Sequence, residues 1–472
     1  MSGRKTAARV RKQRSPQPSR AHVAPPAPPR PVLADAVPLF IRLEREVEDE
    51  FRAQMLEALQ RKVDGIPREP KDRVCCKGCG KPMKNKDARR VSWLCRFGRV
   101  CAKPVRYRCS SCRKTRRPLL EVLEVEPGRI CGSLARLLAL LGAVVPFELA
   151  SRLAWILLGV RVSPMSVWRC VQRLGEAAVR HDTALSAYHA DSRSVTTPVA
   201  CPSDTVVLGV DGCALGMQVR TRRRHFTAPE QRLVPLPKVE DGHFREVKTG
   251  VLFQASDRFE SSPGRRSVVR RVLVTCLGNA DAIFSHMWAR LQDLRWMGPN
   301  TVVVIVGDGA EWIWKRAAEM FPNRCEILDF WHAIEYAWAF ARLQYGDESK
   351  AGDRWVHRLA RSLRAGKVDE VIARLRTLHP ATPEAKEAFE ALIGYYTDNK
   401  VRMRYDEYLR LGYGIGSGAV ESAHKQVVHA RLRQAGMRWS VAGAQRLLAL
   451  RILLLNGEWE KLDRLGMVRL AA

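Results

Sequence analysis

Five short runs of aliphatic and β-branched residues in the middle of the chain most constrain how it can fold. They comprise residues 205–210, 245–254, 271–276, 301–306 and 325–328. Segments of helical periodicity follow the last three runs, at residues 281–294, 311–320 and 332–343. Because short apolar runs alternate with segments of helical period, the pattern predicts an α/β fold.

Acidic residues stand beside this pattern at three distant points. Asp211 and Asp308 each end an apolar run, at the rim of the sheet where sites in open α/β folds lie. Glu421 shares a helical face with apolar residues, so we expect its carboxylate to point towards the sheet. Those apolar residues are Val428, Leu432 and Ala435. Grouped carboxylates repel one another, and a hard divalent cation can hold them together. We therefore expect two Mg²⁺ or Mn²⁺ ions, which suit phosphodiester chemistry.

Each acid could instead cap a helix or pair with an arginine, because structural ion pairs are common. The order of the elements favours a shared site, with acids after the first and fourth strands and on a later helix. This order is that of an RNase H-like core, here with an all-helical insertion at residues 344–410. Asp329 also follows an apolar strand and is the rival of Asp308 for the second metal ligand.

Four long motifs lie in the second half of the chain. They are GDGAEWIW at 307–314, LDFWHAIEYAW at 328–338, GSGAVESAHK at 416–425 and RLRQAGMRWS at 431–440. These motifs closely resemble those of the DDE transposases of ISKra-type insertion sequences, which are distantly Mutator-like. The resemblance covers roughly residues 70–460 and is strongest from Asp308 onward.

By this resemblance Asp211 in GVDG matches the first catalytic acid, Asp308 the second and Glu421 the third. The family's D/C-x-x-H element matches Asp329 to His332; this pair either supports the metal ligands from behind or is a buried hydrogen-bonded pair at a helix start. The resemblance implies a transposase that binds the terminal inverted repeats of its insertion sequence and cleaves and joins DNA strands. Two alternatives stay open: an inactive or domesticated sequence-specific DNA-binding protein, and a stand-alone nuclease.

Two C-x-x-C pairs, Cys76–Cys79 and Cys109–Cys112, stand with 29 residues between them. Four thiolates can bind Zn²⁺ tetrahedrally, and the metal would supply much of the folding energy of so small a module. We expect a zinc-ribbon-like module at residues 71–120, in agreement with the cysteine-rich N-terminal module of the resembled family. Redox dithiols or unpaired core thiols are the alternatives. Three further cysteines complicate the ligand assignment: Cys75, Cys95 and Cys101.

The chain of 472 residues has a formal net charge of +31, a surplus typical of proteins that bind a polyanion. We expect double-stranded DNA as the partner, both element ends and target. A helix-turn-helix-like pair turns at 159–162, and its second helix begins after Ser163 and Pro164. It indicates a helical DNA-binding region at 121–200, although a pair packed on the core would look the same. The candidate DNA contacts are Arg169, Arg173, Arg222, Arg223, Lys425, Arg431, Arg433 and Arg438, with Trp168 and Gln172 beside the first two.

The remaining segments complete the organisation. We expect a disordered basic arm at 1–35, an amphipathic helix at 36–70, and two parts of the catalytic core at 201–343 and 411–472. No apolar stretch approaches the roughly 20 residues that cross a bilayer, and the N-terminus lacks the apolar region of an export signal. We therefore expect a bacterial cytoplasmic protein, associated with the nucleoid through DNA and without a membrane partner. Because two DNA ends must be brought together, we expect a homo-oligomer.

Overall fold

The computed structural model describes residues 37–70, 72–123, 125, 130–190, 204–218, 243–262 and 265–465. The basic arm expected at 1–35 lies outside these residues, as do Arg222 and Arg223. The chain divides into two compact units, Met1–Gln54 and Met55–Ala472. Helix α1 (Leu39–Asp64) crosses the boundary between them, and in the first unit its apolar residues are exposed.

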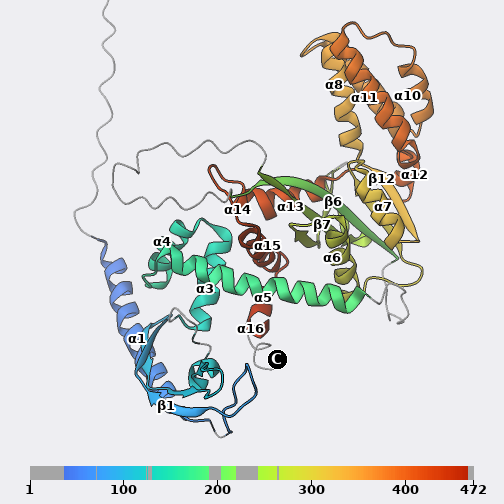
Figure 1. The fold of residues 1–472 in the computed structure, drawn as a ribbon. Coiled ribbons are helices and arrows are strands. Elements are labelled where there is room, and N and C mark those ends of the chain that lie inside the picture. Colours follow the sequence, from blue (N-terminus) through green and yellow to red (C-terminus); the bar gives the residue numbers. More distant parts are fainter. Residues whose placement is uncertain are drawn as a thin grey trace, which may run out of the picture. The chain divides into compact units, whose positions relative to one another are not determined.

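The five expected strands pair into one mixed sheet, shown in green and yellow in Figure 1. They are β6 (Thr205–Gly216), β7 (Phe244–Gln254), β10 (Val272–Cys276), β11 (Val302–Gly307) and β12 (Arg324–Leu328). Their order in the sheet is β10-β7-β6-β11-β12. The ladders β10–β7 and β7–β6 are antiparallel, whereas β6–β11 and β11–β12 are parallel. The sequence therefore predicted the sheet's strands, and the structure supplies their order.

One strand is longer than expected. The first strand was expected to end at Asp211, but β6 continues to Gly216. The reason is that β6 stays paired with the long strand β7 as far as Gly216 and Phe244, well beyond the end of its parallel partner. Asp211 therefore lies within a strand, although it stands beyond the parallel part of the sheet.

Helices cover both faces of this sheet. A Cβ atom at Gly209 of β6 would lie 3.4 Å from Val420 of α13 (Gly418–His424). A Cβ atom at Gly250 of β7 would meet Met287 of α6 (Ala280–Asp293). Gly209 pairs with the residue next to Gly250, and successive residues of a strand face opposite sides. Helices α13 and α6 thus lie on opposite faces, which explains why the strands are apolar throughout.

The cysteine-rich segment forms two small sheets. One has the order β1-β4-β5 and the other pairs β2 with β3. The elements are β1 (Lys84–Ala88), β2 (Val91–Cys95), β3 (Gly98–Ala102), β4 (Val105–Arg108), β5 (Thr115–Arg116) and α2 (Pro118–Val122). A core of only a few buried side chains, including Trp93 and Val100, supports the β2–β3 hairpin, so this segment has little hydrophobic stabilisation of its own.

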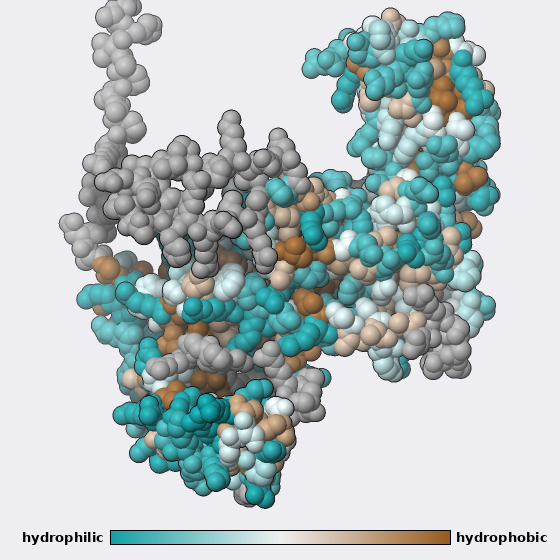
Figure 2. Space-filling view, in the orientation of Figure 1, coloured by the Kyte–Doolittle hydropathy of each residue, from teal (hydrophilic) through white to brown (hydrophobic). Residues whose placement is uncertain are grey.

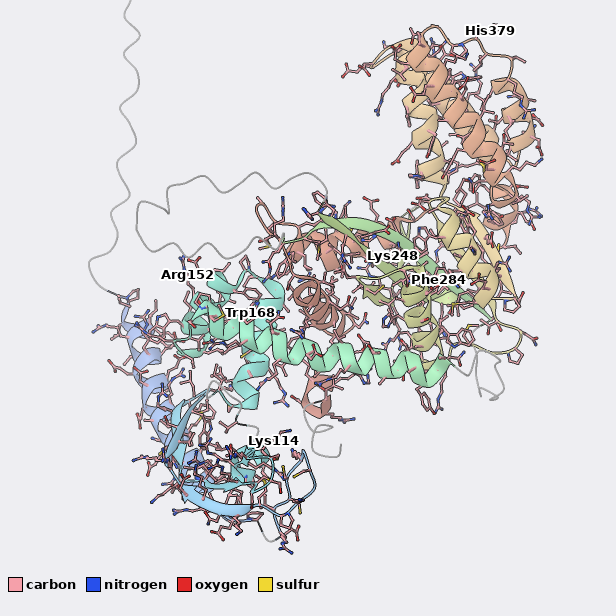
Figure 3. The ribbon with its side chains drawn as sticks, viewed as in Figure 1. Lys114, Arg152, Trp168, Lys248, Phe284 and His379 are labelled. Atoms are coloured by element: carbon pink, nitrogen blue, oxygen red, sulfur yellow. The ribbon has the colours of Figure 1, made fainter. Side chains whose placement is uncertain are left out.

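The helical region after it contains α3 (Gly132–Val144), α4 (Phe147–Leu158) and α5 (Pro164–Ala190). The expected turn is present: Gly159 ends α4 with a φ of 62°, and Pro164 opens α5. Helix α5 packs on α3 and on α15 (Val441–Leu455). Several apolar side chains of α4 and α5 are exposed, among them Trp155, Ile156 and Trp168. Figure 3 labels Trp168 on α5.

The segment between β12 and α13 is helical: its first helix matches the one expected at 332–343, and the others lie within the insertion expected at 344–410. Its helices are α8 (Phe330–Tyr345), α9 (Lys350–Arg364), α10 (Val368–Leu375), α11 (Pro383–Asn399) and α12 (Tyr405–Arg410), with a short 3₁₀ turn, η3 (Lys400–Arg402). Helix α8 packs against both α9 and α11. Hydrophilic residues cover most of the visible face of these helices in Figure 2.

The remaining elements are short or lie near the C-terminus. They are η2 (Ala255–Asp257), β8 (Arg258–Ser262), β9 (Arg265–Val268), α7 (Glu311–Met320), η4 (Lys425–His429), α14 (Ala430–Leu432) and α16 (Lys461–Leu465). Glu421, Val428 and Leu432 were expected on one face of a regular helix, but α13 gives way to the π-turn η4 and then to α14. Among the described helices, none combines the length and apolar character that a membrane crossing requires.

Candidate functional site

Three aspartates lie on one row across neighbouring parallel strands; we call them the aspartate row. The β6–β11 ladder ends at the pair Gly209 and Val306, two residues before Asp211 and Asp308. The β11–β12 ladder ends one residue before Asp308 and Asp329. Because residues in register on parallel strands stand side by side, Asp211, Asp308 and Asp329 follow one another along the same edge of the parallel strands, although their carboxylate oxygens do not all lie within 4.8 Å of one another. Asp308 and Asp329 were alternatives for the second metal ligand, and the structure places them beyond the ends of two neighbouring strands.

Asp211 faces a buried histidine on α13. Its Oδ2 atom lies 3.4 Å from Nε2 of His424, whose side chain is only 6% exposed. Neither ring nitrogen of His424 makes an aligned hydrogen bond within the described residues, so the contact is an ion pair. Burial alone would lower the pKa of His424, but its pairing with Asp211 and Cys213 outweighs burial and raises the pKa to about 9. Burial also opposes ionisation of Asp211, yet His424 holds its pKa below the ordinary value.

Asp308 and Asp329 each accept a backbone hydrogen bond just beyond the sheet. Oδ1 of Asp308 accepts from Ala310 N at 3.0 Å. Oδ1 of Asp329 accepts from Trp331 N at 2.9 Å and so caps α8. Oδ2 of Asp329 accepts from the Ser417 hydroxyl, which stands just before α13. Each carboxylate is thereby fixed through one oxygen atom at least, and the start of α13 is tied to the row.

A cluster of three ring side chains packs next to Asp308. The Tyr395 hydroxyl donates to the Asp308 carbonyl at 2.6 Å. Its ring stacks on Tyr336 with centroids 4.1 Å apart, and His332 packs edge-on against both tyrosines. The hydrogen bond from Tyr395 therefore ties the backbone of Asp308 to α11 of the insertion.

The expected pairing of Asp329 with His332 is not what the structure has. Asp329 bonds instead to Trp331 N and Ser417, and Nδ1 of His332 lies 3.2 Å from Glu335. The physical reason is the capping geometry, because an N-cap side chain turns back to the first backbone N–H groups of its helix. His332 still acts electrostatically on Asp211, where it adds a small lowering of the pKa to that of His424.

Glu421 does not lie on the inward face where it was expected. Val428 and Leu432 are buried, but Glu421 and Ala435 are exposed. The Glu421 side chain is 65% exposed and pairs with Lys425 at 2.6 Å. Among the described residues, only the four cysteines of the C-x-x-C pairs bring three or more potential metal ligands within 4.8 Å of one another, so neither the three aspartates nor Glu421 belongs to so tight a cluster. Glu421 faces solvent and pairs with Lys425.

The π-turn η4 explains this change. It adds a residue to one helical turn, so positions before and after it no longer share the face that a regular helix would give them. The buried guanidinium of Arg451 holds the turn: Nε donates to Val427 O at 2.7 Å, Nη1 to Ala143 O at 2.5 Å, and Nη2 to Gln426 O. Within α13 itself, His424 contacts Asp211 of the sheet, whereas Glu421 pairs with Lys425 at the surface.

Sequence reasoning missed three residues of this site. His424 stands three residues after Glu421 amid Val420, Ala423 and Val427, and this apolar surrounding was the signal for its burial. Arg451 interrupts the apolar run LLALRILLL, and a lone charge in such a run indicates a buried, bonded group. Tyr395 carried no such signal, because only the packing of α11 brings it to Asp308.

The four cysteines of the C-x-x-C pairs come together as expected. Sγ of Cys76 lies 3.2 Å from that of Cys112, and Sγ of Cys79 lies 3.5 Å from Cys109 and 3.9 Å from Cys112. A Zn²⁺ ion with four thiolates at 2.3 Å requires sulfur atoms about 3.8 Å apart. The Gly78 N–H, with Cys112, lowers the pKa of Cys76 to about 6. The cluster could hold a structural metal ion such as zinc, and Cys75 lies outside it.

The candidate DNA contacts fall into two groups. Arg169, Lys425, Arg433 and Arg438 are exposed, and Arg173 is half-buried. Arg431 is wrong as a DNA contact, since it is only 1% exposed. Its Nε donates to Gly142 O, and its guanidinium lies 4.8 Å from the centroid of Phe147. Gln172 is likewise buried, because α5 packs on α15 there.

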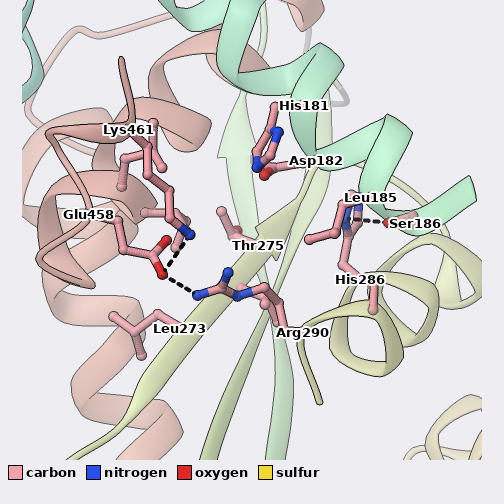
Figure 4. A pocket seen from close by; sticks show the side chains of 14 residues that line it. His181, Asp182, Leu185, Ser186, Leu273, Thr275, His286, Arg290, Glu458 and Lys461 are labelled. Carbon is pink, nitrogen blue, oxygen red and sulfur yellow. Dashed lines mark hydrogen bonds and ion pairs between the residues drawn. The ribbon is translucent and has the colours of Figure 1, made fainter. Parts of the chain in front are cut away.

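A small polar pocket of about 30 Å³ lies between α5, α6, β10 and the C-terminal helices, and shares no residue with the aspartate row (Figure 4). Arg290 and Lys461 both pair with Glu458 beside it. Asp182 lines the pocket without an ion pair or hydrogen bond to any described residue. Burial, the largest influence, raises the pKa of Asp182 to about 6. The pocket is lined by a network of polar and charged side chains from four elements.

Fold and site together define a mixed α/β protein with a carboxylate row at one edge of its sheet and a separate four-cysteine cluster suited to a structural metal ion. No family model matches this chain, and no curated protein matches it significantly.

Proposed function

We propose that this protein is a DNA transposase that cleaves and joins DNA strands with the help of divalent metal ions. The observation that carries the proposal is the aspartate row: three aspartates follow the parallel ladders of adjacent strands, Asp211 within β6 and Asp308 and Asp329 just beyond β11 and β12, in a chain with a net charge of +31. Carboxylates at a sheet edge suit metal-assisted phosphodiester chemistry, and a strongly basic chain suits a nucleic acid as the substrate.

The sheet supports an RNase H-like core. Numbered along the chain, its strands have the order 3-2-1-4-5, with the first three antiparallel and the last two parallel to the first. The first and fourth strands carry Asp211 and Asp308, the two acids that the resemblance to DDE transposases assigns to catalysis. Helices α9 to α12 lie within the proposed insertion at 344–410.

The donor set fits Mg²⁺ or Mn²⁺, because carboxylate oxygens are the ligands that these hard cations prefer. Asp211 and Asp308 would hold the ions, with Asp329 beside them; Glu421 would join if its pairing with Lys425 opens. Bound Mg²⁺ would activate the attacking oxygen and stabilise the leaving one. In the cysteine module, the same reasoning from thiolate donors favours Zn²⁺.

The chain's own residues have definite tasks in this proposal. His424 offsets the negative charge of Asp211. Ser417 and the Trp331 N–H orient Asp329, and Tyr395 fixes the backbone at Asp308. These contacts hold the carboxylates in place although they repel one another, which is the preorganisation that catalysis needs.

A cleavage and strand-transfer assay tests the proposal. It uses purified full-length protein, labelled DNA from both flanks of its own coding region, and Mg²⁺ or Mn²⁺. The variants are Asp211→Asn and Asp308→Asn, with Asp398→Asn as the matched control because Asp398 is exposed and without a described partner. We expect metal-dependent cuts at inverted repeats with wild type and control, and none with the other two. Cutting that survives Asp211→Asn would overturn the assignment.

A second function, DNA binding without cleavage, is favoured by one observation: Glu421 is exposed and paired with Lys425 instead of facing the row. In that case the acids serve structure alone. Sequence-specific DNA binding with no cutting by any of the proteins, at any metal concentration, would establish this function in place of the first.

A further inference from the structure

The outer face of α9 carries a stripe of basic side chains, which we call the α9 stripe. It consists of Lys350, Arg354, His357, Arg358 and Arg361, all of them exposed. At about 100° per residue these positions fall within roughly 100° of one another around the helix axis. They therefore form one continuous band along α9.

The opposite face of α9 fixes the direction of this stripe. Gly352, Val356, Leu359 and Leu363 are buried, and they lie diametrically across the helix from the basic residues. This apolar face packs against α8. The stripe consequently faces away from the core of the insertion.

Within the described residues, the three arginines of the stripe make no ion pair. Neighbouring helices of the insertion behave differently: Lys367 and Arg374 share Glu370, and Lys400 pairs with Asp369. Like charges three and four residues apart destabilise a helix. A polyanion bound along the stripe would supply the opposite charge and offset this repulsion.

The stripe also leads towards the aspartate row. At the C-terminal end of α9, the guanidinium of Arg364 lies 4.8 Å from the ring centroid of Phe330 and 5.8 Å from that of Trp331. These two aromatic residues directly follow Asp329. From Lys350 to Arg364 the helix spans about 20 Å at 1.5 Å per residue, the length of about six base pairs.

We propose that the α9 stripe binds the phosphate backbone of double-stranded DNA and guides the duplex to the aspartate row. The contact is independent of base sequence, because guanidinium groups that meet phosphates carry no sequence information. The destination at the row rests on the proposed function, whereas the binding itself does not. The insertion is thereby assigned a DNA surface in addition to its contacts with the core.

The test measures how DNA affinity depends on salt in the full-length protein. The variant is Arg354→Gln/Arg358→Gln/Arg361→Gln. The matched control is Arg374→Gln/Lys386→Gln/Arg410→Gln, which removes the same charge from three insertion residues that already pair with acids. Fluorescence anisotropy with a duplex of about 30 base pairs of arbitrary sequence gives the dissociation constant from about 50 to 200 mM KCl. Circular dichroism checks that both proteins are folded.

Each phosphate contact contributes about 0.9 to the slope of log affinity against log salt. We expect the stripe variant to lose about 2 to 3 from this slope and to bind at least about tenfold more weakly at low salt, while the control follows wild type. Equal slopes for all three proteins would overturn the proposal, as would a control that weakens as much as the stripe variant. Wild-type protein that binds with a steep slope but never cuts DNA would contradict the proposed function and leave this inference standing.

Discussion

The Asp211 carboxylate lies 3.4 Å from Nε2 of His424, a contact that joins the central strand of the sheet to the last turn of α13. His424 is buried, and Asp211 is about one-third exposed. A buried cation beside the row offsets part of the repulsion among its carboxylates, so the row can persist in the folded protein. The same contact sets the rotation of α13, which leaves Glu421 on the solvent side.

A double-mutant cycle of Asp211→Asn and His424→Gln measures this pair. Because breaking a mostly buried ion pair leaves one charge without its partner, each single variant should lower the free energy of unfolding by about 1 to 3 kcal/mol at pH 7. The double variant should lose less than the sum of the two, with a coupling of about 1 kcal/mol or more. Urea unfolding followed by circular dichroism gives these values. Strictly additive losses would mean that the two side chains do not interact.

Arg451 is predicted to hold the π-turn. Its guanidinium donates to three backbone carbonyls, and a lysine could satisfy only part of this set. Arg451→Lys should therefore lower the free energy of unfolding by about 2 to 4 kcal/mol. Arg446 of the same helix is the matched control: it pairs with Glu176 at a partly exposed site, and Arg446→Lys should cost less than about 1 kcal/mol. Similar losses for the two variants would argue against the role given to Arg451.

The cysteine cluster predicts a metal-dependent fold for residues 73–118. Protein purified without chelator should contain about one zinc ion per chain, because four thiolates within 4.8 Å fit a tetrahedral site. Cys79→Ser should lose the metal and expose this segment to limited proteolysis. Cys75→Ser, one residue from the cluster, should keep both. Metal content comes from atomic emission spectrometry, and a Cys79→Ser protein with wild-type zinc would show that the ligand set is wrong.

The sequence predicted the strands of the sheet well because each is an apolar run flanked by charged or glycine-rich segments. It also predicted Asp308 beyond β11 and the four-cysteine cluster, since both follow from local patterns. It failed where long-range packing decides the outcome. Arg431 looked like a surface cation, yet it is buried beside Gly142, some 290 positions earlier in the chain.

The failure at Glu421 has a local cause that periodicity cannot reveal. A regular helix would have placed Glu421 on the face of Val428 and Leu432, and the extra residue of η4 breaks that relation. The turn depends on Arg451, which lies more than twenty residues further along the chain. Likewise, the adjacency of Asp211, Asp308 and Asp329 follows from strand register, which a single sequence does not state.

The last prediction concerns pH and the pocket beside α5. Burial raises the pKa of Asp182 from the ordinary 3.8 to about 6, so between these values the folded protein binds more protons than the unfolded chain does. The contribution of Asp182 to the free energy of unfolding is fully present below about pH 4 and declines as the pH rises through about 6. Burial lowers the pKa of His181 and of His286, and these two histidines change stability in the opposite direction near pH 6. Asp182 must therefore be isolated by substitution.

Asp182→Asn removes the ionisation and keeps the shape of the side chain. The difference in unfolding free energy between variant and wild type should rise in favour of the variant from pH 4 to pH 6, by about 2 kcal/mol, and then stay constant. Urea unfolding at about four pH values across this range gives the difference directly. Asp398→Asn, at an exposed position, should give a difference that does not vary with pH. A flat difference for Asp182→Asn as well would mean that Asp182 ionises in the folded protein as readily as in the unfolded chain, and that the pocket admits enough water to solvate it.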